Sequence, residues 1–157
     1  MMRVKAAESE EAAIIYQFIL KKAEFDRSVG ADSGTIQTSA AKIQKTLFSD
    51  RPFAYVLFVE NGQDKIGFAL YGFRYSSFVG QPSMWLDDLF IIPKMRNKGA
   101  GTLLMNKLQQ IAQEFNCSHL AWTADARNID GLRFYIGLGA EVIEQKNHRC
   151  FLNWNVL

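Results

Sequence analysis

Hydrophobic side chains recur along the chain with two spacings, one typical of strands and the other typical of helices. Alternation predicts a short strand at 2–7, and runs rich in β-branched and aromatic residues predict strands at 53–60 and 65–75. Further strands are predicted at 83–92 and 118–125, with two closing strands within 140–157. Apolar positions three and four residues apart predict helices at 9–24, 102–115 and 128–136, and a short helix that starts after Thr38 or Ser39. Strands and helices mixed in this order, without an internal repeat or a linker, predict a single α/β or α+β domain over residues 1–157.

Three local signals refine this outline. Ser9, followed by Glu10 and Glu11, is typical of a helix start. The segment 61–64, Asn-Gly-Gln-Asp, is a hairpin signal between two predicted strands. The polar segment 26–39 is long for a compact domain, and such loops often bind ligands.

Composition narrows the class of protein. Of 157 residues, 48% are hydrophobic and 22% are charged, which is typical of a folded chain. A formal net charge of +2 gives no reason to expect a nucleic-acid partner. No apolar stretch approaches the roughly 20 residues that span a bilayer, and the N-terminus is polar where a signal peptide would be apolar. We therefore expect a soluble cytoplasmic protein with no membrane partner.

Cysteine and histidine are too scarce to suggest a disulfide framework or a metal site. Cys117 and Cys150 are far apart in the sequence, and neither His119 nor His148 belongs to a metal-binding motif. We expect two reduced thiols and no metal.

A basic, glycine-containing elbow joins the strand at 83–92 to the helix at 102–115. Pro93 ends the strand, and Arg96, Gly99 and Gly101 precede the helix. Such a loop turns several backbone N–H groups toward one point at the positive end of the helix dipole, a geometry that binds phosphate. Arg96 and Lys98 add charge suited to a pyrophosphate. Taken alone, the elbow could also be a simple turn with solvated basic residues, because neither GxxxxGK[ST] nor GxGxxG is present.

Two motifs in order resemble the GNAT superfamily of N-acetyltransferases. The elbow sequence RNKGAG fits the superfamily signature R/Q-x-x-G-x-G/A, and NIDGLRFYIGLGA resembles its asparagine-containing loop and the helix that follows. The blocks IGFALYGFRYSSFVG, WLDDLFIIPKMRNKGAG and RFYIGLGA extend the likeness to the spermidine/spermine and thialysine acetyltransferase branch. The resemblance implies an acetyl-CoA-dependent N-acetyltransferase. It also implies a mixed, mostly antiparallel, twisted sheet of six to seven strands flanked by about four helices.

The resemblance further implies where acetyl-CoA binds. Backbone groups of Leu89, Phe90 and Ile91 would pair with the pantetheine arm, and Asn128 would meet the arm from the start of the next helix. Arg96 would shape the elbow and its charge rather than react. The amides that would hold the pyrophosphate belong to Asn97, Lys98, Gly99, Ala100, Gly101 and Thr102.

Acetyl transfer to an amine requires two proton movements, because a primary amine with a pKa near 10 is mostly charged at pH 7 and the CoA thiolate must be protonated. Tyr135 matches the position of the proton-donor tyrosine in the resembling enzymes, although a helix tyrosine can also simply pack against the core. Asp87 matches an acidic residue of the polyamine branch that helps to move the amine proton through water. Neighbouring strand residues point to opposite faces, so only one of Asp87 and Asp88 should face the cleft. Asp88 is the alternative, or else a structural acid paired with a cation.

The acceptor amine is the least determined part. The resemblance places Phe25, Asp26 and Asp87 at the substrate cleft, together with Trp122 and Thr123 on the facing strand. Basic residues near the C-terminus stand where the polyamine enzymes carry acids, which weakens a polyamine assignment: Lys146, His148 and Arg149.

We expect a small primary amine such as a polyamine, a lysine analogue or an amino acid. Two alternatives are an acetyltransferase acting on a protein lysine or N-terminus, and a non-catalytic acyl-CoA-binding module. Most enzymes of the branch are dimers, so a homodimer is also expected.

Overall fold

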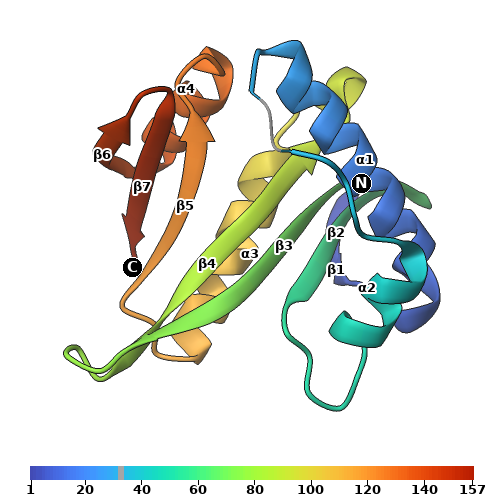
Figure 1. Cartoon of the computed structure of the whole chain (residues 1–157), viewed down its shortest axis with the longest axis horizontal. Helices are drawn as coiled ribbons and strands as arrows, with labels where there is room; N and C mark the ends of the chain where they lie inside the picture. The colour runs from blue at the N-terminus through green and yellow to red at the C-terminus, as the bar shows by residue number, and fades with distance from the viewer. Residues whose placement is uncertain (32–33) are drawn as a thin grey trace.

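The computed structural model describes residues 1–31 and 34–157, so positions 32 and 33 of the expected binding loop lie outside the described residues. The elements, shown in Figure 1, are β1 (Met2–Ala6), α1 (Ala12–Ser28), α2 (Ala40–Leu47), β2 (Tyr55–Asn61), β3 (Asp64–Ser76), β4 (Gln81–Ile91), α3 (Ala100–Glu114), β5 (His119–Asp125), α4 (Ile129–Leu138), β6 (Glu141–Lys146) and β7 (Arg149–Asn155). Short 3-10 turns lie at Ser9–Glu11 and Pro93–Met95. The expected fold class is confirmed by the seven strands and four α-helices of the described chain.

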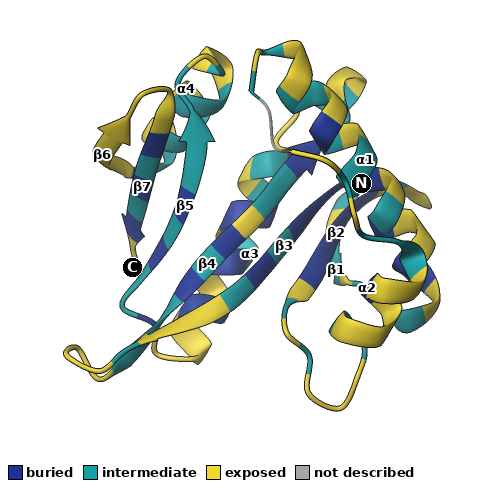
Figure 2. Cartoon of the chain, in the orientation of Figure 1, coloured by how far each residue is buried: buried dark blue, intermediate teal, exposed yellow. Residues whose placement is uncertain are grey.

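The strands form one sheet in the order β1-β2-β3-β4-β5-β7-β6. Every neighbouring pair is antiparallel except β4 and β5, which are parallel. Helices α1 and α2 pack on one face of the sheet, and α3 and α4 pack on the other (Figure 1). Both faces are covered at the centre, which is why β2 is buried over five consecutive residues (Figure 2).

Alternating side chains of the central strands supply two cores. Phe58 and Phe68 are fully buried and pack on Phe18 of α1, with the Phe18 and Phe68 rings stacked 5.4 Å apart. Residues one position along, such as Leu57 and Ala69, face α3 instead. Each fully buried large side chain contributes about 1.5–3 kcal/mol, so these two cores hold the helices against the sheet.

Helix boundaries differ slightly from the sequence expectation. Helix α1 continues to Ser28, so Phe25 and Asp26 lie within the helix rather than just after its predicted end at residue 24. The expected cap Ser9 is wrong, because Glu8 and Glu11 form a reciprocal capping box one residue earlier. Ser39 caps α2 as expected, accepting a hydrogen bond from the Lys42 amide at 3.1 Å.

Strands β4 and β5 separate along their length. They pair only at Met84 with Leu120 and at Trp85 with Ala121. Beyond this point β4 stays paired with β3, but no residue of β5 pairs with it. A register shift also occurs here: Leu70 of β3 faces Asp88 and Tyr71 faces Leu86, which leaves Asp87 as the extra residue of a β-bulge. The separation and the bulge create the opening in which the candidate site lies.

Candidate active site

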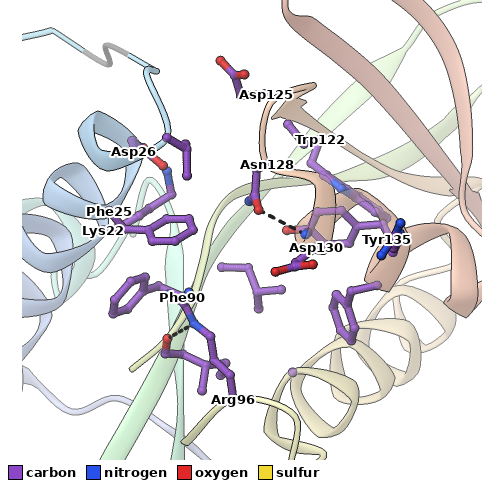
Figure 3. Close-up of a pocket in the computed structure, with 18 of the residues that line it drawn as sticks. Lys22, Phe25, Asp26, Phe90, Arg96, Trp122, Asp125, Asn128, Asp130 and Tyr135 are labelled. Atoms are coloured by element: carbon purple, nitrogen blue, oxygen red, sulfur yellow. Dashed lines mark hydrogen bonds and ion pairs between the residues drawn. The ribbon is translucent and has the colours of Figure 1, made fainter. Parts of the chain in front are cut away.

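A cleft of about 950 Å³ opens where β4 and β5 separate. It is bounded by the end of α1, the second half of β4, the elbow, β5 and the start of α4 (Figure 3). Of the residues predicted from the sequence, the cleft is lined by Phe25, Asp26, Asp87, Leu89, Phe90, Ile91, Arg96, Asn97, Gly99, Ala100, Gly101, Thr102, Trp122, Thr123, Asn128 and Tyr135. Lys98 is exposed and does not line it. Residues far apart in the sequence are therefore gathered around one opening.

The elbow presents a row of unpaired amides to this cleft. Gly99 caps α3 in the left-handed conformation with φ 91°, and Asn97 is also left-handed with φ 62°. Within the described part of the chain, no acceptor is found for the backbone N–H groups of residues 97–102. Four of these lie at the α3 N-terminus, where the helix dipole favours negative charge. Such an arrangement of amides can bind an anion.

Glycine at position 101 has a packing reason as well. A Cβ at Gly101 would lie 3.0 Å from the Phe134 ring of α4. The start of α3 and the second half of α4 are therefore in close contact at the cleft. A larger side chain here would push the two helices apart beside the site.

Arg96 turns away from the amide row. Its Nε donates a hydrogen bond to the Ile91 carbonyl at 2.8 Å, and its guanidinium lies 4.3 Å from the centre of the Phe25 ring. The side chain thus joins the end of β4 to the last turns of α1. The role expected for Arg96, to shape the elbow, stays a prediction, and its side chain does not join the row of backbone amides.

Asn128 is the N-cap of α4. Its Oδ1 accepts a hydrogen bond from the Gly131 amide at 3.1 Å. A Cβ at Gly131 would lie 2.5 Å from the Asn128 side-chain nitrogen, so glycine is required for this close approach. The cap orients the side chain at the rim of the cleft, where its amide nitrogen has no acceptor in the described structure.

Tyr135 projects from α4 into the same cleft and packs on Trp122 of β5, with ring centres 5.1 Å apart (Figure 3). Burial, with the negative charges of Asp26 and Asp88, raises the pKa of the Tyr135 phenol well above its usual value. The phenol is therefore protonated over the whole physiological range and available as a proton donor. Trp122 itself is 2% exposed, and its Nε1 has no hydrogen-bond partner among the described residues. Because this buried donor lies beside the cleft, it is available to a ligand acceptor.

The two neighbouring acids of β4 have different environments. Asp87, the bulged residue, is exposed, lines the cleft and accepts a weak hydrogen bond from Trp85 Nε1 at 3.4 Å. Asp88 is mostly buried, and its Oδ1 lies 3.4 Å from the Lys22 ammonium. Burial raises the pKa of Asp88 to about 6, against the opposing effect of Lys22. The geometry thus favours Asp87 as the acid open to the cleft and Asp88 as the paired acid.

Sequence reasoning missed Lys22. Its ammonium lies 2.8 Å from Asp26 Oδ2 as well as 3.4 Å from Asp88, and it lines the cleft from α1 (Figure 3). The nearby carboxylates outweigh burial and raise the pKa of Lys22 above its usual value, so it stays charged. Helical spacing of Lys22 and Asp26 could have suggested their pairing, but Asp88 is brought to Lys22 only by the tertiary fold.

The cleft carries further charged groups that the sequence did not single out. Arg127 forms a bidentate pair with Asp125, with two contacts of 2.8 Å, and Arg133 and Arg149 also reach the lining. No three histidine, cysteine, aspartate or glutamate side chains of the described chain gather as a metal-binding group. No described helix is long and apolar enough to cross a membrane.

Comparison with known proteins places this geometry in a family. The model of the Acetyltransferase (GNAT) family matches residues 19–140. Thialysine N-epsilon-acetyltransferase of Mus musculus is 26% identical over 147 residues, which cover 88% of this chain and 84% of that protein. Two solved structures share the fold. An integron cassette protein of V. cholerae has a TM-score of 0.72 at 26% identity, covering 93% and 89% of the two chains. The PaiA N-acetyltransferase of Thermoplasma acidophilum, solved with coenzyme A, has a TM-score of 0.76 at 12% identity, covering 99% of each.

The chain belongs to the acetyltransferase (GNAT) family, since the family model spans well over half of it. The family predicted from the elbow and the second motif is confirmed, and with it the expected class of enzyme, an N-acetyltransferase. The roles assigned to individual site residues stay predictions.

Proposed function

We propose that this protein transfers an acetyl group from acetyl-CoA to a primary amine of a small molecule. The observation that carries the proposal is that one cleft contains both an unpaired row of amides at the start of α3 and a phenol held protonated on α4. The first suits the pyrophosphate of a CoA thioester, and the second suits a leaving sulfur that needs a proton.

Acetyl-CoA fits the residues that are present. The amides of residues 97–102 would hold its pyrophosphate, and the unpaired edge of β4 at Leu89 would bind the pantetheine arm as a short extra strand. Asn128 and the unsatisfied Nε1 of Trp122 are further groups that the arm can satisfy. When bound, acetyl-CoA supplies the thioester from which the acetyl group is transferred.

Two side chains move protons in the proposed reaction. As the amine nitrogen forms its bond to the acetyl carbon, the Asp87 carboxylate accepts the amine proton through water. As the carbon–sulfur bond breaks, the Tyr135 hydroxyl donates its proton to sulfur. The exposure of Asp87 suits exchange with water, and the burial of Tyr135 beside Trp122 keeps its phenol neutral. Proton-donor and proton-acceptor roles therefore fall on α4 and on the β4 bulge, respectively.

We infer a small amine as the acceptor, such as a polyamine, a lysine analogue or an amino acid. The support is the mouse relative, which is named for acetylating thialysine, and a cleft with carboxylates on both α1 and β4.

We further propose that residues 1–157 form one acetyltransferase domain that works as a homodimer in the cytoplasm. Two buried, unpaired cysteines suit a reducing compartment.

The test is release of free CoA thiol from acetyl-CoA against a panel of polyamines, diamines, amino acids and lysine peptides. We expect release with at least one small amine and little with the peptides. Release only with peptides would replace the proposal with a protein acetyltransferase. Tight acetyl-CoA binding without release for any acceptor would indicate an acyl-CoA-binding module instead.

A further inference from the structure

On the wall of the cleft formed by α1, the side chain of Lys22 carries a positive charge. A site that binds a cationic amine needs negative charges, so a lysine here is unexpected. The Lys22 ammonium lies between two carboxylates, 2.8 Å from Asp26 and 3.4 Å from Asp88. The Lys22 side chain is 25% exposed and both carboxylates are 18% exposed, so the group is largely shielded from solvent. Lys22 lines the cleft, and the negative charges of Asp26 and Asp88 reach Tyr135. This ion-paired group therefore lies on the wall of the cleft that faces Tyr135 (Figure 3).

Lys22 changes which acceptors the cleft can hold. A polyamine or diamine loses one proton to react, but its remaining ammonium groups still need carboxylate partners. Asp26 lines the cleft on α1, Asp88 does not line it, and Lys22 already engages both of these shielded carboxylates. A second ammonium of the acceptor that approached Asp26 would have to displace Lys22 or lie beside it, and two like charges in contact repel strongly where solvent is largely excluded.

The opposite wall carries a second positive charge, which has no carboxylate partner in the described structure. Arg149, at the start of β7, lines the cleft and is exposed. No ion pair or hydrogen bond of its guanidinium is found in the described structure. A carboxylate on the acceptor can pair with this guanidinium at the rim, while the reactive amine points toward Tyr135.

We propose, resting on the proposed function, that Lys22 is a specificity-determining residue that excludes diamines and polyamines. The accepted substrates are then amines with a single positive charge, or amines whose second ammonium is balanced by a carboxylate of the same molecule. Free amino acids with a side-chain amine belong to this class. Lysine and cadaverine are matched probes, because they are the same diamine with and without an α-carboxylate.

The experiment measures kcat/KM for lysine and for cadaverine with acetyl-CoA, and separately the Kd of each amine for the CoA-bound protein. It compares the wild type with Lys22→Met and Lys22→Gln, the second of which keeps a hydrogen-bond donor for the carboxylates. The pH is about 8.5, so that Asp88 remains ionised when Lys22 is removed. Lys21→Met is the matched control, since Lys21 is the exposed neighbour on α1 and does not line the cleft.

We expect the wild type and Lys21→Met to favour lysine, and the neutral Lys22 variants to shift the lysine-to-cadaverine ratio toward cadaverine by roughly tenfold or more, the usual effect of one charge-assisted hydrogen bond. Lys22→Arg keeps the charge and should keep the wild-type ratio. Ratios within twofold of wild type in both neutral variants, or a wild type that favours cadaverine, would overturn the proposal. The Kd ratios decide this even if no amine is acetylated, which would instead contradict the proposed function.

Discussion

Tyr135 is the residue whose environment most directly suits its proposed chemistry. It lies against Trp122 and Phe134, with ring centres 5.1 and 5.4 Å away, and within the field of two carboxylates. All of these effects disfavour the phenolate, so the hydroxyl stays protonated, as the proposed proton donor must be. The sequence motif predicted the position of this tyrosine, whereas its burial and its contact with Trp122 depend on the packing of α4 against β5.

Replacing Tyr135 by phenylalanine removes the hydroxyl and keeps the ring contacts. We expect kcat to fall by roughly 10²–10⁴, the usual contribution of a general acid, while the Kd of acetyl-CoA changes little. Steady-state kinetics and calorimetric titration of acetyl-CoA check the two quantities. Tyr75→Phe, on the exposed β3–β4 hairpin, is the matched control. Equal kcat in the wild type and Tyr135→Phe would remove Tyr135 from the reaction.

Asp88 makes the stability of the protein depend on pH. Its folded-state pKa of about 6 lies above the ordinary value of 3.8, so the folded protein binds this proton more tightly than the unfolded chain. The contribution of protonated Asp88 to the free energy of unfolding is fully present below about pH 4 and is lost as pH rises through about 6. The Asp88→Asn variant cannot ionise at this position, so its free energy of unfolding does not fall in this way. Relative to wild type, its free energy of unfolding should therefore rise between pH 4 and 7, by roughly 2 kcal/mol.

Urea denaturation at several pH values measures this difference. Asp50→Asn, at an exposed position after α2, is the control and should run parallel to wild type across the range. A constant difference between Asp88→Asn and wild type from pH 4 to 7 would show that Asp88 titrates normally in the folded state.

At the scale of elements, the hydrophobic pattern predicted each strand and helix, with boundaries shifted by a few residues. Apolar runs in β2 and β3 and helical spacing in α3 are local properties, so a single sequence displays them. The β-bulge at Asp87 and the separation of β4 from β5 are different, because they are properties of pairing between strands. No local pattern shows that Leu89, which pairs with β3, has no partner on β5.

The contact between α3 and α4 provides a prediction at this scale. Gly101→Ala places a methyl group 3.0 Å from Phe134 and should move the start of α3, weakening acetyl-CoA binding several-fold. Gly137→Ala is the matched control, because it is also helical but has no atom within 4 Å of the added Cβ. It should leave the Kd unchanged and stabilise α4 by up to about 1 kcal/mol. Calorimetry and thermal melting separate the two effects, and equal Kd values in both variants would mean that this contact does not position the amides.

At the scale of the whole molecule, the cleft is assembled from both sides of the sheet. Helix α1 on one face supplies Lys22 and Asp26, and α4 on the other supplies Tyr135 (Figures 1 and 3). The sequence predicted most of the lining residues through its likeness to a family, but it could not show that Lys22 neutralises two of the acids. That fact depends on the distance between α1 and β4, which only the folded chain determines.

The expected homodimer stays a prediction. Apolar side chains are exposed on α4 and the neighbouring edge strand β6, including Ile136 at 55% and Ile143 at 59% (Figure 2). We expect a sedimentation mass of about twice the 17.8 kDa of one chain at micromolar concentration. A mass equal to one chain across that concentration range would contradict the dimer.

The central claim is that acetyl-CoA and a small amine meet in this cleft and that the amine leaves acetylated. The most direct measurement is mass spectrometry of the amine after incubation with acetyl-CoA and the purified protein, with Tyr135→Phe run in parallel. The account predicts that a small amine gains one acetyl group with the wild type and gains it far more slowly with Tyr135→Phe. Unchanged mass for every amine of the panel, with acetyl-CoA bound to the wild type, would contradict it.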